Sequence, residues 1–161
     1  MPTNSFQSLG DHSFCISQER VSRTDPKAIT YMFSFNSPKP SSYTNIDTGD
    51  TTQFKWQGGV LTNNDKVIFV PCNSQSVGIY NCSDSTFSSV NISDSSSTKW
   101  FGGALSVDGN VIFVPSHVSY IGIFNPYNNS YRSVNTGISG AYLWQGGIAL
   151  PDGRIVFIPR N

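Results

Sequence analysis

The chain has 161 residues and a formal net charge of zero; charged residues make up 12% of it and aromatic residues 13%. This length predicts a single domain over residues 1–161. A charged fraction about half of the usual ~25% argues against a nucleic-acid partner, which needs a basic surface, and gives no support for attraction to an anionic membrane. A neutral chain with few charges favours association, so the composition indicates a β-rich, assembling protein and not an enzyme.

Residues 12–47 carry a degraded copy of a repeat that becomes clear further along the chain. Phe35-Asn36 matches Tyr80-Asn81, and the segment 43–46 fits a fourth strand with one inserted residue. The tryptophan and the double glycine of the later copies are missing here. Residues 1–10 lack the basic patch and apolar run of a signal peptide, and no stretch approaches the ~18 apolar residues of a transmembrane helix. We therefore expect no membrane insertion and a cytoplasmic or virion-associated protein.

A repeat of 44 residues (144 − 100 = 100 − 56 = 44) organises the rest of the chain, with copies over 54–92 and 98–136 and a half copy over 142–161. Each copy opens on a tryptophan and a double glycine: Trp56 with Gly58 and Gly59, Trp100 with Gly102 and Gly103, and Trp144 with Gly146 and Gly147. A turn follows, at Asn64-Asp65, Asp108-Gly109 and Asp152-Gly153. An apolar run then ends in proline, at Pro71, Pro115 and Pro159. This regularity predicts tandem structural units.

Each complete copy is expected to fold into four antiparallel strands. Asp-Gly favours a two-residue type I′ turn with positive φ at both central residues, so the first two strands should form a tight hairpin. The second strand (67–71, 111–115 and 155–159) is apolar without alternation, which indicates burial on both faces, and its final proline stops the pairing. The third strand (78–81, 122–125) and a polar fourth strand (87–91, 131–135) complete the unit. The double glycine should let neighbouring backbones approach closely at the centre of a radial array.

Four-stranded units with a recurring tryptophan, Gly-Gly and Asp-Gly resemble β-propeller blades of the broad kelch-like or WD40-like kind. Kelch repeats place the double glycine before the tryptophan, and the Gly-His and Trp-Asp signatures of WD40 blades are missing here. The pattern W-x-G-G…D-G…P is more similar to uncharacterised propeller repeats of protists, bacteria and large DNA viruses. The resemblance covers roughly residues 31–159. It implies an all-β, β-propeller-like array of four-stranded antiparallel blades, with about 3 to 3.5 blades per chain, and it brings no catalytic residues.

The blade count leaves three accounts open. Propellers close with 4–8 blades, and four blades of 44 residues would need 176 residues, more than the 161 present. In the first account, strands 144–159 pair with strands 31–47 in a composite blade, giving three blades per chain, so that two chains close a six-bladed ring. In the second, the chain is an open arc whose exposed edges pair with other subunits. In the third, it belongs to a longer propeller.

Candidate catalytic and metal-binding residues are few. The aspartates at 65, 108 and 152 are explained by turn chemistry, and His117 is expected to be a solvated loop residue. His12 lies far from His117 in the chain, and the cysteines at 15, 72 and 82 have no regular spacing. We therefore expect free thiols and no catalytic residue, no metal and no cofactor.

Two interpretations fit the repeated tryptophans at 56, 100 and 144. They pack between adjacent blades, or they stack on sugar rings at the blade junctions, with Gln57 and Gln145 as polar neighbours and Phe101 in the equivalent place of the middle copy. The sequence favours a non-catalytic structural or interaction protein, a propeller-type scaffold that assembles with itself or with other protein subunits, for example in a virion, a fibre or another large particle. The alternative is a carbohydrate-binding, lectin-like module with a glycan partner.

Overall fold

The computed structural model describes residues 7–8, 14–15 and 45–160, and this part of the chain is all-β. The expected degenerate blade at 12–47 lies almost wholly outside the described residues. Of its expected fourth strand, residues 45–46 are described and belong to no strand. Near the N-terminus, β1 (Gln7–Ser8) pairs antiparallel with β2 (Phe14–Cys15).

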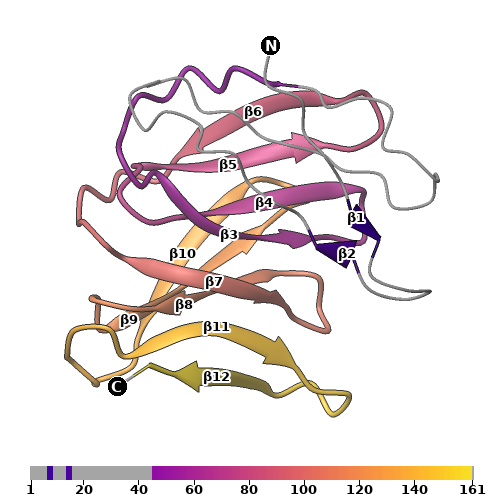
Figure 1. Ribbon diagram of the computed structural model, residues 1–161. Coiled ribbons are helices and arrows are strands. Elements are labelled where there is room, and N and C mark those ends of the chain that lie inside the picture. Colours follow the sequence, from indigo (N-terminus) through magenta and orange to yellow (C-terminus); the bar gives the residue numbers. More distant parts are fainter. Residues whose placement is uncertain (1–6, 9–13, 16–44, 161) are drawn as a thin grey trace.

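Two four-stranded antiparallel sheets and one two-stranded sheet follow in chain order (Figure 1). The first full blade contains β3 (Trp56–Leu61), β4 (Lys66–Pro71), β5 (Ser76–Asn81) and β6 (Thr86–Asn91). The second full blade contains β7 (Trp100–Leu105), β8 (Val111–Pro115), β9 (Tyr120–Asn125) and β10 (Ser130–Asn135). The half-blade contains β11 (Trp144–Ala149) and β12 (Ile155–Pro159). In each full blade the strands pair in chain order, which is the meander of a propeller blade.

The first strands of the three sheets lie next to one another, and glycine makes this approach possible. Gly58, Gly102 and Gly146 all have positive φ, and each lies where the register between the first and second strands shifts. A Cβ atom on Gly58 would stand 3.0 Å from the Cα of Gly102. Two separate constraints therefore favour glycine at this position: the positive φ of the bulged backbone and the close backbone of the next sheet.

The hairpin turns differ from the expected type I′ geometry. In the second full blade the Gly109 N–H donates to the Ser106 carbonyl, and the Ser106 N–H donates to the Asn110 carbonyl. Within the loop 107–109, positive φ occurs at the glycine and not at Asp108. This is a three-residue loop in which a tight turn is followed by one left-handed residue. The half-blade repeats these bonds between Leu150, Gly153 and Arg154, with Gly153 at φ 89°.

The hydrophobic core lies between the two full blades. The first contributes Ile68, Val70, Val77 and Ile79, and the second contributes Trp100, Val111, Phe113 and Phe124. The apolar runs of β4 and β8 are largely buried, as the sequence predicts. The same run in β12 alternates between half-buried and exposed residues. Its pattern is that of a buried strand, but one of its two faces is uncovered.

The described residues contain no group of three or more histidine, cysteine, aspartate or glutamate side chains placed to hold a metal ion. No helix with the length and hydropathy needed to cross a membrane occurs in the described ranges.

Candidate interaction surface

The repeated tryptophans do not have equal environments. Trp100 is fully buried in the core between the full blades. Its indole N–H donates to the Tyr120 carbonyl at 3.1 Å, and its ring lies 5.3 Å from that of Phe113. This ring is a packing element with no face open to a sugar. Trp56 and Trp144 are half-buried, and each has a phenylalanine of its own sheet as a ring neighbour.

The two glutamines proposed as polar neighbours are exposed. Gln57 lies in β3 and Gln145 in β11, each next to its tryptophan in sequence. Within residues 45–160 neither glutamine side chain forms a hydrogen bond. The structure therefore places both at the surface but does not gather them around one ligand position.

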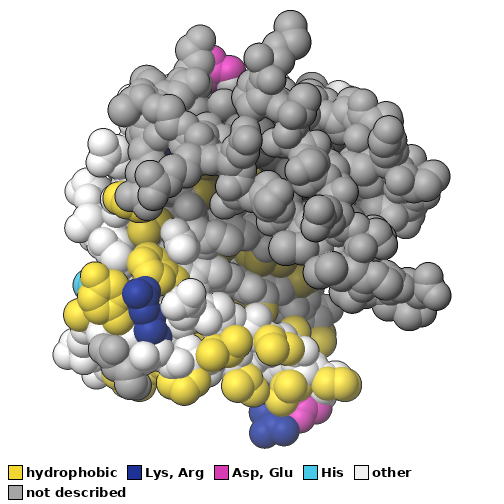
Figure 2. Space-filling view, viewed as in Figure 1, with side chains coloured by type: hydrophobic (Ala, Val, Ile, Leu, Met, Phe, Trp, Pro, Cys, Tyr) yellow, Lys and Arg dark blue, Asp and Glu magenta, His cyan; other side chains and the backbone are white. Residues whose placement is uncertain are grey.

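The half-blade exposes a face that is buried in the first full blade. Ile148, Val156 and Ile158 are 59%, 49% and 45% exposed. One repeat earlier the same positions hold Ala104, Ile112 and Val114, and two repeats earlier they hold Val60, Ile68 and Val70, with the last two fully buried. The half-blade thus presents a blade-packing face with no described blade against it. Figure 2 shows hydrophobic side chains along the lower part of the molecule, over β11 and β12.

The glycine of the half-blade confirms that this face is open within the described structure. A Cβ on Gly146 would meet nothing nearer than the Ile158 Cδ1 at 3.9 Å. The equivalent atom on Gly102 would stand 2.9 Å from the backbone of Gly146 itself. The backbone of Gly146 is bulged in the same way, with φ 83°, but no further sheet of the described residues approaches it.

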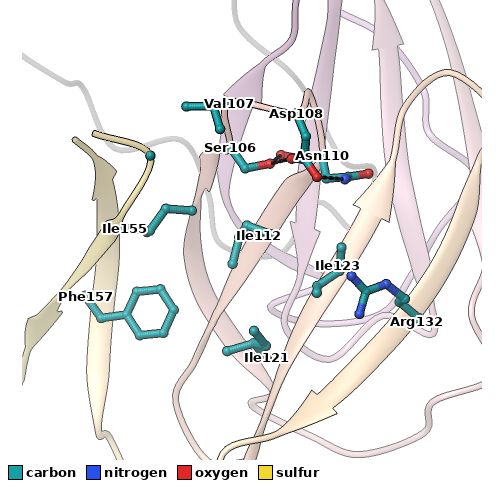
Figure 3. Close-up of a pocket in the computed structure, with 11 residues that line it drawn as sticks. Ser106, Val107, Asp108, Asn110, Ile112, Ile121, Ile123, Arg132, Ile155 and Phe157 are labelled. Carbon is teal, nitrogen blue, oxygen red and sulfur yellow. Dashed lines mark hydrogen bonds between the residues drawn. The ribbon is translucent and has the colours of Figure 1, made fainter. Parts of the chain in front are cut away.

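A cavity of about 380 Å³ opens between the second full blade and the half-blade (Figure 3). Its apolar wall is formed by isoleucines of the second full blade and by Ile155 and Phe157 of β12, and its rim includes polar groups of the turn 106–110 and Arg132. The apolar residues of the second full blade are Ile112, Ile121 and Ile123.

This cavity marks the place of two missing strands. In the first full blade the equivalents of the cavity isoleucines are Ile68, Val77 and Ile79, which are buried. They are part of one cluster with Phe124 of β9, and Tyr131 of β10 packs against it. The half-blade has no described third or fourth strand to supply such aromatic groups. Ile155 and Phe157 also correspond to Val111 and Phe113, whose Cα partners lie in β9, so β12 is a free sheet edge in the described structure.

The turn aspartates have local partners. The Ser106 hydroxyl and the Asn110 amide donate to Asp108, and the Arg154 guanidinium donates to Asp152. These hydrogen bonds hold the pKa of both carboxyl groups below the ordinary value. Both side chains are exposed, and their bonds close the turns as Asx motifs do.

One polar cluster was not foreseen from the sequence. Lys99 is fully buried, and its ammonium donates to the carbonyl oxygens of Ser74 at 2.9 Å, Ser96 at 2.8 Å and Asp94 at 3.3 Å. Burial lowers the pKa of Lys99, and the nearby Asp94 opposes this. The three carbonyls satisfy all three N–H donors of the ammonium group. These hydrogen bonds join the segment that connects the two full blades to the first full blade and stabilise it there. Lysine precedes tryptophan at Lys55 as well, but leucine does so at 143.

Tyr120 and Asp94 complete this cluster. The Tyr120 hydroxyl donates to the Asp94 carboxylate at 2.6 Å. Burial, together with this hydrogen bond, raises the pKa of Tyr120 to about 12. Burial alone would raise the pKa of Asp94, but the hydrogen bonds from Tyr120 and Ser96 and the charge of Lys99 bring it below the ordinary value.

Solved structures with a similar fold are β-propellers. A catalytically inactive virginiamycin B lyase from Staphylococcus aureus with quinupristin matches with a TM-score of 0.66 at 12% identity, over 80% of this chain and 41% of that one. A streptogramin B lyase matches with a TM-score of 0.62 at 12% identity, over 73% of this chain and 38% of that one. No family model and no curated protein matches the chain. The chain therefore has a propeller-like, all-β fold and spans about 41% of the length of the propeller that it matches.

Proposed function

We propose that this protein is a non-catalytic, propeller-type scaffold that assembles with a second copy of itself through the half-blade. The observation that carries the proposal is the uncovered face of Ile148, Val156 and Ile158, whose repeat equivalents Ile68 and Val70 are fully buried. Exposed apolar patches of this kind mark interaction sites. The free edge of β12 beside the cavity supports the same conclusion, because an unpaired edge is a template for pairing with another chain.

A second copy is the partner that best matches this face. In the second full blade, the side that covers Ile68 and Val70 carries a tryptophan and a phenylalanine, Trp100 and Phe113. The first full blade of a second copy presents the same pair, Trp56 and Phe69, both half-buried. A net charge of zero means that two copies do not repel each other. The matched part corresponds to 41% of the neighbouring propeller, so two copies of it correspond to most of a ring of that length.

A charge placed on the packing face tests the interface. Ile148→Lys introduces an ammonium where the proposal places a buried aliphatic group, so sedimentation velocity of the full chain should show a shift from dimer to monomer. Ile138→Lys is the matched control, because Ile138 is 49% exposed in the connection between β10 and β11 and lies outside the packing face. Equal sedimentation of the two variants would contradict an interface on the half-blade.

A role as a component of a virion, a fibre or another large particle would extend this assembly beyond two copies. It is supported by the low charge of the chain and by the free edge of β12. Electron microscopy of the full chain at high concentration tests this extension: ordered polymers support it, and discrete small particles at every concentration contradict it.

A further inference from the structure

A second surface combines aromatic rings with a cation at the junction between the second full blade and the half-blade. The Arg160 guanidinium lies 4.4 Å from the centre of the Tyr142 ring and 5.3 Å from that of Phe101. The His117 ring stands edge-on to Tyr142 at 4.1 Å. We call these four residues the aromatic–arginine cluster. Tyr142 is 42% exposed, and Arg160 is also exposed. Figure 2 shows hydrophobic side chains next to a basic side chain on one side of the molecule.

The backbone under this cluster is a repeated framework. The His117 N–H donates to the Thr98 carbonyl, as the Asn73 N–H donates to the Phe54 carbonyl one repeat earlier. Phe54, Thr98 and Tyr142 occupy one repeat position and all have positive φ, between 51° and 57°. The backbone therefore directs the side chain at the position of Phe54, Thr98 and Tyr142 in the same way at each junction, although the residue type differs.

The side chains on this framework change completely between junctions. At the junction of the two full blades the four positions hold Gln57, Asn73, Thr98 and Ser116. There the Thr98 N–H donates to the Asn73 side chain at 2.7 Å, and the Asn73 amide donates to the Gln53 carbonyl at 2.9 Å, while Gln57 is exposed. The next junction replaces this uncharged set with two aromatic rings, an imidazole and a guanidinium. Both sets of side chains are compatible with the same backbone framework. Folding alone therefore does not explain why the second junction carries aromatic and basic residues.

The charge of Arg160 is available to a ligand. Within the described residues Arg160 forms no ion pair, and the ion pair present there joins Arg154 to Asp152. A guanidinium that lies over an aromatic ring is held in place while the N–H groups along its edge remain free to bind a planar carboxylate with two hydrogen bonds. The exposed ring of Tyr142 and the half-buried ring of Phe101 beside it offer an apolar surface for the body of the ligand.

We propose that the aromatic–arginine cluster binds a carboxylate-bearing sugar such as a hexuronate. Arg160 holds the carboxylate, and the rings of Phe101 and Tyr142 contact the apolar face of the sugar ring. This site is distinct from the repeated tryptophans and does not rest on the proposed assembly, because it lies on other residues than the packing face.

Calorimetric titration of the full chain with D-glucuronate, D-glucose and acetate separates the two parts of the site. We expect glucuronate to bind at least tenfold more tightly than either of the others, because glucose lacks the carboxylate and acetate lacks the ring. If acetate bound as tightly as glucuronate, the site would recognise only the carboxylate and not the sugar ring. If glucose bound as tightly as glucuronate, Arg160 would make no contribution to recognition. Either result would contradict the proposal. The absence of glucuronate binding at millimolar concentration would overturn the proposal.

Two variants tie the binding to the cluster. Arg160→Gln should weaken glucuronate binding at least tenfold, whereas Arg154→Gln, at the other exposed arginine of the half-blade, should leave it unchanged. Tyr142→Gly removes the ring at a residue with φ 57°, where glycine is favoured, so the chain should fold and lose affinity. Affinity that is equal in Arg160→Gln and Arg154→Gln would contradict the assignment. Sedimentation of the same variants should be unaltered, which separates this test from that of the assembly.

Discussion

Gly102 and Gly146 are in backbone contact: a Cβ atom on Gly102 would stand 2.9 Å from the Cα of Gly146. Gly58 has the same relationship with Gly102, at 3.0 Å. The glycines that follow each tryptophan are therefore the points at which successive sheets of the array touch. Since Gly146 has no such neighbour among the described residues, the series of contacts ends at the half-blade within this part of the chain.

The first prediction concerns Gly102→Ala. The added methyl group meets the backbone of the half-blade and also forces a non-glycine residue to φ 79°, so we expect a loss of about 3 kcal/mol in the free energy of unfolding. Gly137→Ala is the matched control, because Gly137 has φ 72° and open space around it, and about 1 kcal/mol is expected there. Urea unfolding measures both. Equal losses would show that the sheets do not touch at glycine.

The second prediction concerns Gly146→Ala. Among the described residues of one chain the added methyl group meets only the Ile158 Cδ1, so the monomer should lose no more stability than Gly137→Ala does. If a second copy packs on the half-blade as the second full blade packs on the first, the same methyl group should weaken the dimer. Light scattering over a dilution series should find monomer at concentrations where the unaltered chain is dimeric. Unchanged dimerisation would mean that the copies do not meet at this glycine.

The third prediction compares two phenylalanines at one repeat position. Phe113 is fully buried and Phe157 is a half-buried wall of the cavity. At concentrations where the chain is monomeric, Phe113→Ala should cost about 4 kcal/mol and Phe157→Ala about half of that, because less of its ring leaves the protein interior. Chemical unfolding of both variants checks this. A cost for Phe157→Ala as large as that for Phe113→Ala would mean that the cavity is filled in the single chain.

The fourth prediction is a pH dependence at Asp94. Its pKa in the folded chain is below the ordinary value, so the folded state binds fewer protons than the unfolded state near and below about pH 4, and the stability that Asp94 contributes is lost as the pH falls through its folded pKa. The stability difference between the unaltered chain and Asp94→Asn should shrink between pH 6 and pH 3. Asp47→Asn, on an exposed side chain, provides the comparison. A difference that stays constant over this range would contradict the contribution of Asp94.

Much of the fold follows from residue spacing. The recurrence of tryptophan, glycine and proline predicts the hairpins, because a bulge glycine, a turn and a terminal proline each constrain the backbone locally. The third strand begins at Ser76, two residues before the predicted start. The turn type was predicted wrongly because Asp108 is compatible with either hairpin, and the choice depends on the register of the whole ladder.

The surfaces could be predicted less well. Trp56 and Trp100 both follow a lysine and precede a double glycine, yet Trp100 is buried and Trp56 is half-buried, because exposure depends on which sheet lies against each one. The aromatic–arginine cluster joins residues from Phe101 to Arg160 that are far apart in the chain. A comparison of the copies position by position would have singled it out, since all four residues differ from their equivalents one repeat earlier.

The most direct test of the proposed assembly is the mass of the full chain in solution, measured by multi-angle light scattering at micromolar concentration and physiological salt. The chain has a mass of 17.6 kDa, and pairing through the half-blade predicts a particle of twice this mass. A particle of 17.6 kDa at every concentration would contradict the proposal that the open face of Ile148, Val156 and Ile158 is covered by a second copy.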